Sequence, residues 1–308
     1  MGMDGSSLPE PLGPDRTGAW GWWCTGFRPE GDSPGALLED LFGLASDRAW
    51  RRVRGRETFP WPGEEDLVVK RFQGGEARDW WFERLREGEL PRSPGRREAE
   101  NLMALAADGL PAPRAVAWVE EDSARRRPGL PGTGGRSALV MERIEYQRTL
   151  RQALASADPL ERERLGVALL ELVAKLHGSG WYHRDLYLDH VVQLDNGELC
   201  LLDLGRARRQ ESPRERWFIK DLAALYSSTP GAIPPRARLR FLARWLKRRR
   251  GATPGSRRRR SDLRRWSRVI QAKAKRLAQH APRAADHEGA ARAVQDQRAR
   301  DGRHGGLA

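Results

Sequence analysis

The stretch Trp181–Arg206, WYHRDLYLDHVVQLDNGELCLLDLGR, decides the fold of this 308-residue chain. Its centre predicts a β-hairpin, because two apolar runs flank the turn residues Asp195-Asn196-Gly197, which tolerate the positive φ of a tight turn. One aspartate stands at each mouth of this hairpin: Asp185 precedes it and Asp203 follows it. The stretch therefore presents two carboxylates from the loops that bracket one pair of strands.

The triplets around these aspartates resemble motifs of the protein-kinase-like fold. His183-Arg184-Asp185 is similar to the H-R-D catalytic loop, and Asp203-Leu204-Gly205 is similar to the D-F-G motif. The resemblance implies that Asp185 accepts the proton of the attacking hydroxyl and that Asp203 holds Mg²⁺ on the nucleotide phosphates. Either triplet alone is a weak signal for a kinase-like fold, since an ordinary turn beside a surface arginine can contain the same residues. Joined by a hairpin and preceded by an amphipathic helix, the two triplets together favour a kinase-like protein.

The resemblance implies an α+β fold with a small β-rich N-terminal lobe and a helical C-terminal lobe. Apolar runs predict strands at 50–53, 57–61, 66–72, 115–120 and 137–144. Helical periodicity predicts helices at 94–107 and 158–177. We expect four segments: an irregular N-terminal extension (1–45) with one short helix at 35–44, an N-lobe (46–144), a C-lobe ending in two basic helices (145–280) and a disordered tail (281–308).

Lys70 and Glu98 are the predicted anchors of the nucleotide phosphates. Lys70 ends the run Leu67-Val68-Val69-Lys70, which resembles the V-A-I-K motif, and the resemblance implies a ligand of the α- and β-phosphates of ATP. The chain has six lysines against fifty arginines, so a lysine here indicates a need for a compact point charge. Glu98 precedes Leu102 by four residues and Leu105 by seven, so it shares their helix face and is the expected partner of Lys70, whereas Glu100 points elsewhere on that spacing. A water-facing strand lysine and an exposed first-turn glutamate are the alternatives.

Two further nucleotide contacts are predicted more loosely. Gly55 stands where kinases place a glycine-rich phosphate loop, and Arg54 or Arg56 could add charge there. Only one glycine is present, so an ordinary hairpin turn explains it equally well. The exit of strand 137–144 is where a kinase hinge holds adenine, mainly through backbone groups; the residues concerned are Met141, Glu142 and Ile144. Plain core packing is the alternative for Met141.

Position 190 narrows the resemblance. Protein kinases place asparagine five residues after the catalytic aspartate, whereas this chain has His190. That pattern, with the later runs IKDLAALYSS and RLRFLARWL, is similar to the bacterial lipopolysaccharide core kinases of the Kdo/heptose (WaaP-type) family over about residues 50–278. The resemblance implies that ATP phosphorylates a sugar hydroxyl of a glycolipid, with Asp203 and His190 holding Mg²⁺ or Mn²⁺. It also implies that Asp221 braces the catalytic loop and that Arg184 ties it to the segment after Asp203.

The acceptor stays open at this point. Kdo, heptose, another glycolipid sugar, a small molecule or a protein would each fit a kinase of this kind. A pseudokinase that binds nucleic acid is a further alternative, suggested by the basic C-terminal region. The presence of every catalytic residue type argues against a pseudokinase, and the absence of a recognisable nucleic-acid motif argues against specific nucleic-acid binding.

The net charge of +14 is concentrated in one segment. Residues 236–276 contain eighteen Lys or Arg and one acid, a charge of +17, which leaves the rest of the chain at −3. Such a cluster is typical of proteins that dock on an anionic membrane surface, although a solvated basic face is the alternative. Since no apolar run approaches the ~20 residues of a membrane span and no signal peptide opens the chain, we expect a cytoplasmic protein, peripheral on the inner face of the inner membrane.

Overall fold

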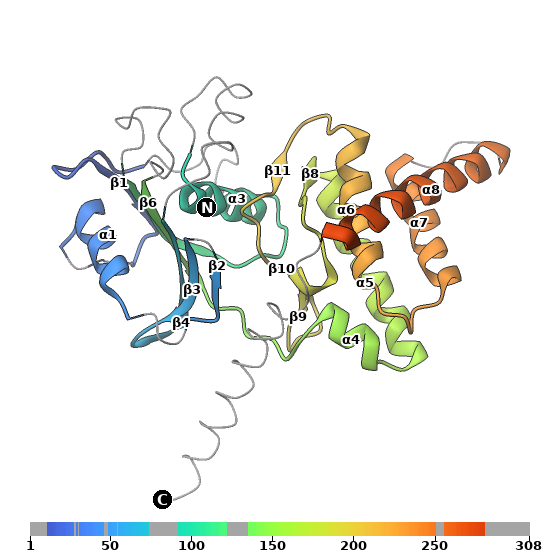
Figure 1. The fold of residues 1–308 in the computed structure, drawn as a ribbon, viewed down its shortest axis with the longest axis horizontal. Coiled ribbons are helices and arrows are strands. Elements are labelled where there is room, and N and C mark those ends of the chain that lie inside the picture. The colour runs from blue at the N-terminus through green and yellow to red at the C-terminus, as the bar shows by residue number, and fades with distance from the viewer. Residues whose placement is uncertain are drawn as a thin grey trace, which may run out of the picture. The chain divides into compact units, whose positions relative to one another are not determined.

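The computed structural model describes residues 11–27, 29, 31–45, 49–53, 55–73, 92–121, 135–250 and 256–280. Contacts divide the described chain into two units, one formed by residues up to 104 with 113–143, the other by 105–112 with 144–280. The first unit is built on a β-sheet and the second mainly on helices (Figure 1). The predicted α+β fold, β-rich first and helical afterwards, is confirmed. The predicted disordered tail at 281–308 lies outside the described residues.

The first unit contains a six-stranded antiparallel sheet in the order β1-β5-β6-β4-β3-β2. The strands predicted from residue 50 onward are confirmed to within a few residues. The elements are β1 (Ala19–Trp23), α1 (Pro34–Gly43), β2 (Arg51–Val53), β3 (Arg56–Trp61), β4 (Glu64–Gln73), α3 (Pro94–Ala107), β5 (Ala115–Glu121) and β6 (Arg136–Glu142).

The register of β3 on β4 decides which side chains share a face of this sheet. Residues paired directly across antiparallel strands point to the same face. Phe59 pairs with Val69, and both pack in the core with Leu37, Leu38 and Leu41 of α1. Thr58 pairs with Lys70 on the opposite face, where the Lys70 side chain meets Glu98 of α3. Helices α1 and α3 therefore cover opposite faces of the sheet (Figure 1).

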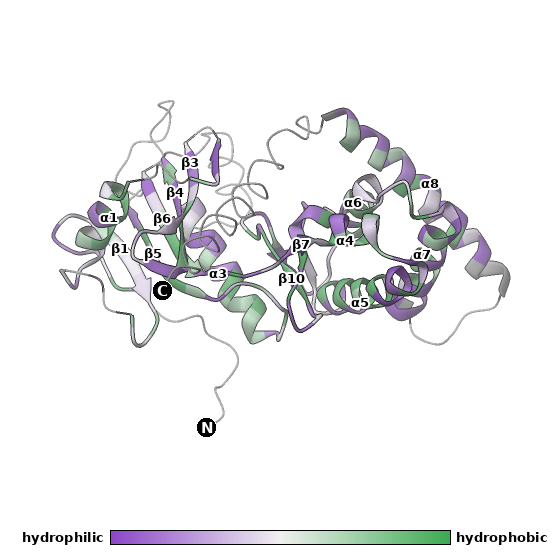
Figure 2. Ribbon diagram, turned by 90° about the horizontal axis from the view of Figure 1, so that it is seen from below, coloured by the Kyte–Doolittle hydropathy of each residue, from purple (hydrophilic) through white to green (hydrophobic). Residues whose placement is uncertain are grey.

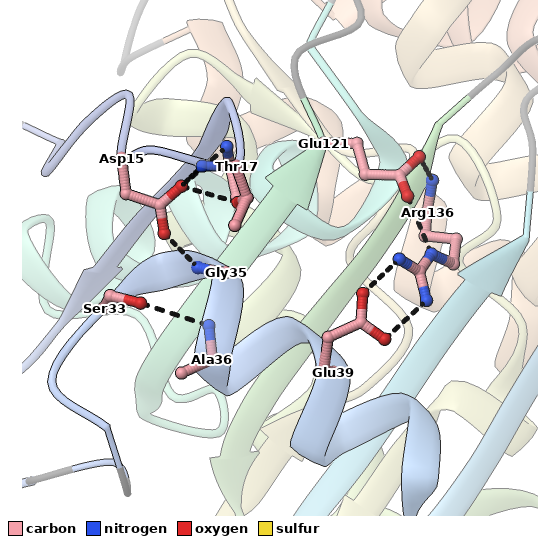
Figure 3. Close-up of polar contacts among 9 residues, drawn as sticks. Asp15, Thr17, Ser33, Gly35, Ala36, Glu39, Glu121 and Arg136 are labelled. Atoms are coloured by element: carbon pink, nitrogen blue, oxygen red, sulfur yellow. Dashed lines mark hydrogen bonds and ion pairs between the residues drawn. The ribbon is translucent and has the colours of Figure 1, made fainter.

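The predicted irregular character of residues 1–45 is wrong for the described part that begins at Leu12. β1 pairs along its whole length with β5, and the predicted helix at 35–44 is confirmed as α1. The reason lies in Asp15, whose carboxylate accepts hydrogen bonds from the Thr17 N–H and hydroxyl, the Ala19 N–H and the Gly35 N–H at 2.6–3.2 Å (Figure 3). Partial burial raises the pKa of Asp15, but these four bonds together outweigh it and lower the pKa to about 2. One carboxylate thus fixes the start of β1 against the start of α1.

Arg136 makes a second connection between α1 and the sheet (Figure 3). Its guanidinium lies 2.5 Å from Glu39 of α1 and 2.7 Å from Glu121 at the end of β5. Hydrogen bonds to Glu39 and then to Glu121 raise the pKa of Arg136. β1 and α1 are therefore held in the first unit by charge as well as by apolar packing.

The second unit surrounds the predicted β-hairpin with helices. Its elements are β7 (Arg148–Thr149), α4 (Leu150–Ser156), α5 (Pro159–Gly178), β8 (Trp181–Tyr182), the 3₁₀ turn η2 (Leu188–His190), β9 (Val191–Gln193), β10 (Leu199–Leu201), β11 (Arg208–Arg209), α6 (Glu215–Ser228), α7 (Pro235–Arg250) and α8 (Ser256–His280). The predicted hairpin is confirmed as β9 and β10, with Gly197 at a φ of 84° in its turn. The long helix is also confirmed: Asp158 caps it through the Leu160 and Glu161 N–H groups.

The two predicted basic helices, α7 and α8, are confirmed and attached by an aromatic cluster. Trp245 of α7 lies 5.2 Å from Trp266 of α8 between ring centroids, and both side chains are buried. Phe218 of α6 and His177 of α5 complete the cluster at 4.6 Å from each other. Figure 2 shows α5 as mostly hydrophobic, whereas α7 and α8 carry hydrophilic residues interrupted by a hydrophobic side. These helices are therefore packed by a narrow apolar stripe that leaves most of their cations outside.

Candidate active site

The loop His183–Asp185, which resembles a kinase catalytic loop, is held by Asp221, a fully buried carboxylate of α6. Its two oxygens accept the backbone N–H groups of His183 and Arg184, each at 2.7 Å. The predicted bracing contact is therefore confirmed. His177, at the end of α5, also reaches this carboxylate: its Nε2 lies 3.3 Å from one Asp221 oxygen. Its ring turns inward because Phe218 and Trp245 form an aromatic site for it.

Two residues of the site adopt the left-handed backbone conformation, Arg184 with φ 73° and Asp203 with φ 56°. Outside glycine this conformation costs of the order of 1–3 kcal/mol and persists only where the surroundings impose it. At Arg184 the imposing group is Asp221, which fixes that residue's N–H. Strain of this kind concentrates at functional sites, and here it falls next to Asp185 and on Asp203 itself.

His183 connects the catalytic loop to the chain just before Asp203. Its Nε2 donates to the Leu202 carbonyl at 3.0 Å, and the residue has no exposed surface. Burial lowers the pKa of His183, which keeps the ring neutral near pH 7. The loop that carries Asp185 and the chain that leads to Asp203 are therefore joined by a hydrogen bond as well as by the strands between them.

The Asp185 carboxylate contacts two cations that the sequence analysis did not assign. Arg206 Nη1 lies 3.0 and 3.2 Å from its two oxygens, and Lys220 Nζ lies 3.5 Å from one of them. Burial lowers the pKa of Lys220, and the opposing effect of the nearby Asp185 carboxylate is smaller, so the pKa is lowered on balance. The sequence could have pointed to Lys220 as a site residue, because it is one of only six lysines and directly precedes Asp221 on the same helix.

Arg184 was expected to tie its loop to the segment after Asp203, and the structure gives its side chain an aromatic contact. Its guanidinium lies over the Trp217 ring of α6, 5.3 Å from the centroid. Burial lowers the pKa of Arg184, and the neighbouring charges of Arg206 and Arg208 lower it further, so that segment repels this side chain. The chain just before Arg184 is joined to the segment after Asp203 through the backbone, where β8 pairs with β11.

Asp203 and His190, the predicted metal ligands, lie together in this unit. His190 Nε2 is 4.0 Å from Asp203 Oδ2. His190 Nδ1 lies 2.8 Å from the Asp185 carbonyl, which can only accept, so Nδ1 carries the proton and Nε2 the lone pair in the neutral ring. Asp189, which precedes His190 and is the competing candidate for a carboxylate ligand of the metal, pairs with Arg151 at 3.3 Å.

Lys70 and Glu98 form a buried ion pair in the first unit, with exposed fractions of 5% and 2%. The predicted contact is present, and its role toward phosphates stays a prediction. Arg56 Nη2 lies 3.8 Å from the second oxygen of Glu98. Glu100, which the spacing placed on another face, pairs with Arg96 at 2.8 Å.

The remaining nucleotide candidates have local structural roles. Gly55 has φ 76°, and a Cβ there would lie 2.6 Å from the Gln73 carbonyl oxygen, so the hairpin backbone itself requires glycine. Arg54 lies outside the described residues. The Glu142 N–H donates to the Arg114 carbonyl at 2.9 Å, and its carboxylate pairs with the Arg114 side chain at 2.6 Å. Adenine contacts by Met141, Glu142 and Ile144 stay a prediction, as does a phosphate contact by Gly55.

Comparison with known proteins shows which family this chain resembles. The sequence profile of the lipopolysaccharide kinase (Kdo/WaaP) family matches residues 66–245. The lipopolysaccharide core heptose(I) kinase WaaP of Pseudomonas aeruginosa is 30% identical over 233 residues, which cover 71% of this chain and 82% of that protein.

Solved structures of WbdD are also similar. One, a complex with the kinase inhibitor LY294002, has 20% identity and a TM-score of 0.40 over 73% of this chain, and another, described as a bifunctional kinase-methyltransferase, has 20% identity and a TM-score of 0.36 over 75%. The chain spans less than half the length of these two structures, 44% and 49%. The family profile extends from β4 to α7, through both units and every catalytic and metal-binding candidate. The chain belongs to the lipopolysaccharide kinase (Kdo/WaaP) family.

Proposed function

We propose that this protein transfers the γ-phosphoryl group of ATP to a sugar hydroxyl, of Kdo or heptose, in a lipopolysaccharide core or a related glycolipid. The observation that carries the proposal is the strained, braced loop that presents Asp185, together with the adjacent Asp203–His190 pair, in a chain of this kinase family. A kinase needs one carboxylate for the acceptor hydroxyl and one for the metal, and these two fill both requirements.

In the proposed reaction Asp185 orients the acceptor hydroxyl and takes its proton as the oxygen attacks the γ-phosphorus. The bond from that phosphorus to the β,γ-bridging oxygen breaks, and ADP leaves with the electron pair. Arg206 and Lys220 lie against the Asp185 carboxylate and compensate its charge before the acceptor enters. Rate enhancement then comes mostly from positioning and charge neutralisation.

Asp203 and His190 are the proposed ligands of a divalent cation. Among the described residues no group of three or more His, Cys, Asp or Glu could hold a metal ion. Two protein ligands nevertheless suit Mg²⁺ at a nucleotide, since it is usually bound by one or two side chains together with phosphate oxygens and water. The imidazole also suits Mn²⁺. The bound cation would neutralise charge on the phosphates.

Lys70 is the proposed ligand of the α- and β-phosphates, with Glu98 holding its ammonium in place. Both side chains are buried and paired, so the cation is prepositioned and loses little freedom on binding. The adenine would contact the chain around residues 141–144, mainly through backbone groups.

The function is tested by mass spectrometry of lipid extracts from cells with and without the gene. We expect the extract without the gene to lack one phosphate on a core sugar, and reintroduction of the wild-type gene, but not of an Asp185→Ala variant, to restore it. An unchanged lipid profile accompanied by autophosphorylation of the purified protein would favour a protein acceptor and contradict the proposal.

We further propose that α8 docks the protein on the anionic inner face of the inner membrane. No helix in the described ranges is both long and apolar enough to cross a bilayer. Several cations of residues 236–276 already form ion pairs within the protein, such as Arg248 with Glu171 and Arg265 with Glu215. Others on α8 are exposed: Arg260, Arg264, Arg268, Lys275 and Arg276. Each Lys or Arg near an anionic leaflet contributes about 1 kcal/mol, which suffices for reversible docking.

Liposome co-sedimentation at physiological salt tests this docking. The triple variant Arg264→Gln/Arg268→Gln/Lys275→Gln should lose binding to anionic vesicles. The matched control Arg238→Gln/Arg244→Gln/Arg248→Gln removes the same charge from α7 residues whose guanidinia already contact carbonyls or glutamates, and it should keep most binding. Equal loss in both variants, or displacement of the vesicles by competitor RNA at low concentration, would contradict a membrane surface specific to α8.

A further inference from the structure

Helix α6 carries a lysine directly before the aspartate that holds the catalytic loop. Asp221 accepts two backbone N–H groups of that loop, each at 2.7 Å. The preceding residue, Lys220, places its Nζ 3.5 Å from Oδ1 of Asp185, and 17% of its side chain is exposed. One turn of α6 therefore fixes the loop and also sets a largely buried cation beside the proposed base.

The contact between Lys220 and Asp185 is longer than a hydrogen bond of an ion pair. Ammonium–carboxylate hydrogen bonds are about 2.7–2.9 Å long, and Lys70 donates a hydrogen bond to Glu98 in the first unit. At 3.5 Å the Lys220 ammonium is attracted to Asp185 without a contact of that kind. An ammonium carries three N–H donors, so Lys220 can stay beside Asp185 and donate to a second anion at the same time.

Arg206 reaches the same carboxylate in a different way. Its Nη1 lies 3.2 and 3.0 Å from the two oxygens of Asp185, and 57% of its side chain is exposed. Because Arg206 contacts both oxygens, it competes with an acceptor hydroxyl for them. Lys220 approaches one oxygen from a packed helix and needs no such movement. A charge that is already in place stabilises a transition state without a cost of reorganisation.

The place of the transferred phosphoryl group follows from the role proposed for Asp185. A base reaches the hydroxyl whose proton it takes at about 2.6–3.2 Å. The phosphoryl group is transferred to the oxygen of that hydroxyl, so its equatorial oxygens pass within a few ångströms of the carboxylate. Negative charge is spread over these three oxygens in the transition state. A cation beside Asp185 therefore lies where this charge develops.

We infer that Lys220 is a further catalytic residue, whose ammonium binds an equatorial oxygen of the transferred phosphoryl group in the transition state. The inference rests on the proposed function and gives Lys220 a role beyond compensating the charge of Asp185. Lys220 keeps its protons, and the bonds that form and break are those of the proposed reaction. A lysine suits this place in a chain of fifty arginines, because a compact ammonium on a flexible stem follows a single oxygen as it moves.

Phosphotransfer by the purified full chain, with Mg²⁺-ATP and lipopolysaccharide from cells without the gene, tests the inference. Lys220→Met removes the charge from a long side chain and should lower kcat at least about 100-fold. Arg206 still pairs with Asp185 in this variant, so Tm should change by about 4 °C or less. Lys220→Arg keeps the charge and should retain more activity than Lys220→Met. Arg216→Met is the matched control, since it removes an exposed cation one turn away on α6, and it should keep kcat within about twofold of the wild type.

Aluminium fluoride separates a contact with the phosphoryl group from a structural role of Lys220. Bound beside ADP and Mg²⁺, it imitates the planar phosphoryl group during transfer. It should raise the ADP affinity of the wild type and of Arg216→Met at least about tenfold, and that of Lys220→Met by less than about threefold, as measured by isothermal titration calorimetry. Without aluminium fluoride the three proteins should bind ADP equally. A full gain in Lys220→Met, or no gain in the wild type, would overturn the inference.

Asp185→Ala distinguishes failure of this inference from failure of the proposed function. If Asp185→Ala abolishes transfer and Lys220→Met keeps kcat within tenfold of the wild type, the role of Lys220 is wrong and the proposed function stands. If the wild type neither binds ADP nor labels lipopolysaccharide, both fail. A slow Lys220→Met variant with a full gain from aluminium fluoride would show that Lys220 only positions Asp185. Should Lys220→Met fail to fold, Lys220→Gln takes its place with the same expected results.

Discussion

Replacing Asp221 by asparagine should damage catalysis without touching any group that contacts substrate. The Asp221 carboxylate accepts two buried backbone N–H groups at 2.7 Å and lies 3.3 Å from His177. Asparagine retains one oxygen and places an NH₂ donor where the second oxygen was, so one N–H of the catalytic loop loses its acceptor. A hydrogen bond to a charged group contributes about 1.5–3 kcal/mol, and an unpaired buried donor costs about 1–3 kcal/mol.

We therefore expect Asp221→Asn to destabilise the protein by about 2–4 kcal/mol, which lowers Tm by several degrees at roughly 2–4 °C per kcal/mol. The strained φ of Arg184 should relax, and a displacement of Asp185 by about 1 Å would cost on the order of 100-fold in kcat. Differential scanning calorimetry, ADP titration and phosphotransfer rates measure the three effects. Asp189→Asn, which changes a partly exposed carboxylate of the same loop, is the control. An Asp221→Asn variant with normal Tm and normal kcat would refute the bracing role.

Further changes test the metal pair and the N-terminal anchor. Asp203→Ala should lower Mg²⁺-ATP turnover by at least about 100-fold, because the cation loses its carboxylate ligand, and turnover within tenfold of the wild type would contradict this. With Mn²⁺ or Mg²⁺ in a coupled ADP assay, His190→Ala should lose most activity and His190→Asn should keep more, whereas Asp189→Ala should stay active. The opposite order would assign the metal to Asp189. The folded-state pKa of Asp15 is lowered to about 2, so its ionised form stabilises the fold above the unfolded-state pKa of about 4, and this stabilisation is lost as the pH falls from about 4 to about 2. Asp15→Asn should therefore lower Tm at pH 7 and lower it less at pH 3; the same difference at both pH values would contradict the anchor.

The hairpin of β9 and β10 and the Lys70–Glu98 pair could be predicted because local patterns determine them. The turn at Gly197 and the strands on either side of it follow from residue type alone. The choice of Glu98 over Glu100 followed from a spacing of four and seven residues to buried leucines, and the structure has Glu98 in contact with Lys70 and Glu100 in contact with Arg96. Periodicity predicts the face of a helix reliably when that face is packed.

The features that were missed depend on contacts between distant residues. β1 has the sequence AWGWW, without the alternation that marks a half-buried strand, and Asp15 connects it to Gly35, twenty residues away. The pairing of Asp185 with Lys220 spans thirty-five residues and has no local pattern. Arg184 was expected to tie its loop to the segment after Asp203, and no local pattern indicates that its guanidinium lies over the Trp217 ring. Tertiary partners of charged side chains are the part of a site that one sequence does not determine.

Phosphotransfer by the purified chain tests the central claim most directly. Lipopolysaccharide from cells without the gene would be incubated with Mg²⁺ and ATP labelled in the γ-phosphoryl group, and the label on core sugars would be measured for the wild type and for Asp185→Ala. We predict that the wild type labels a core sugar, and that Asp185→Ala binds ADP with normal affinity yet transfers no label. Equal labelling by both proteins, or label found only on protein, would contradict the assignment of this chain as a kinase that uses Asp185 to phosphorylate a lipopolysaccharide sugar.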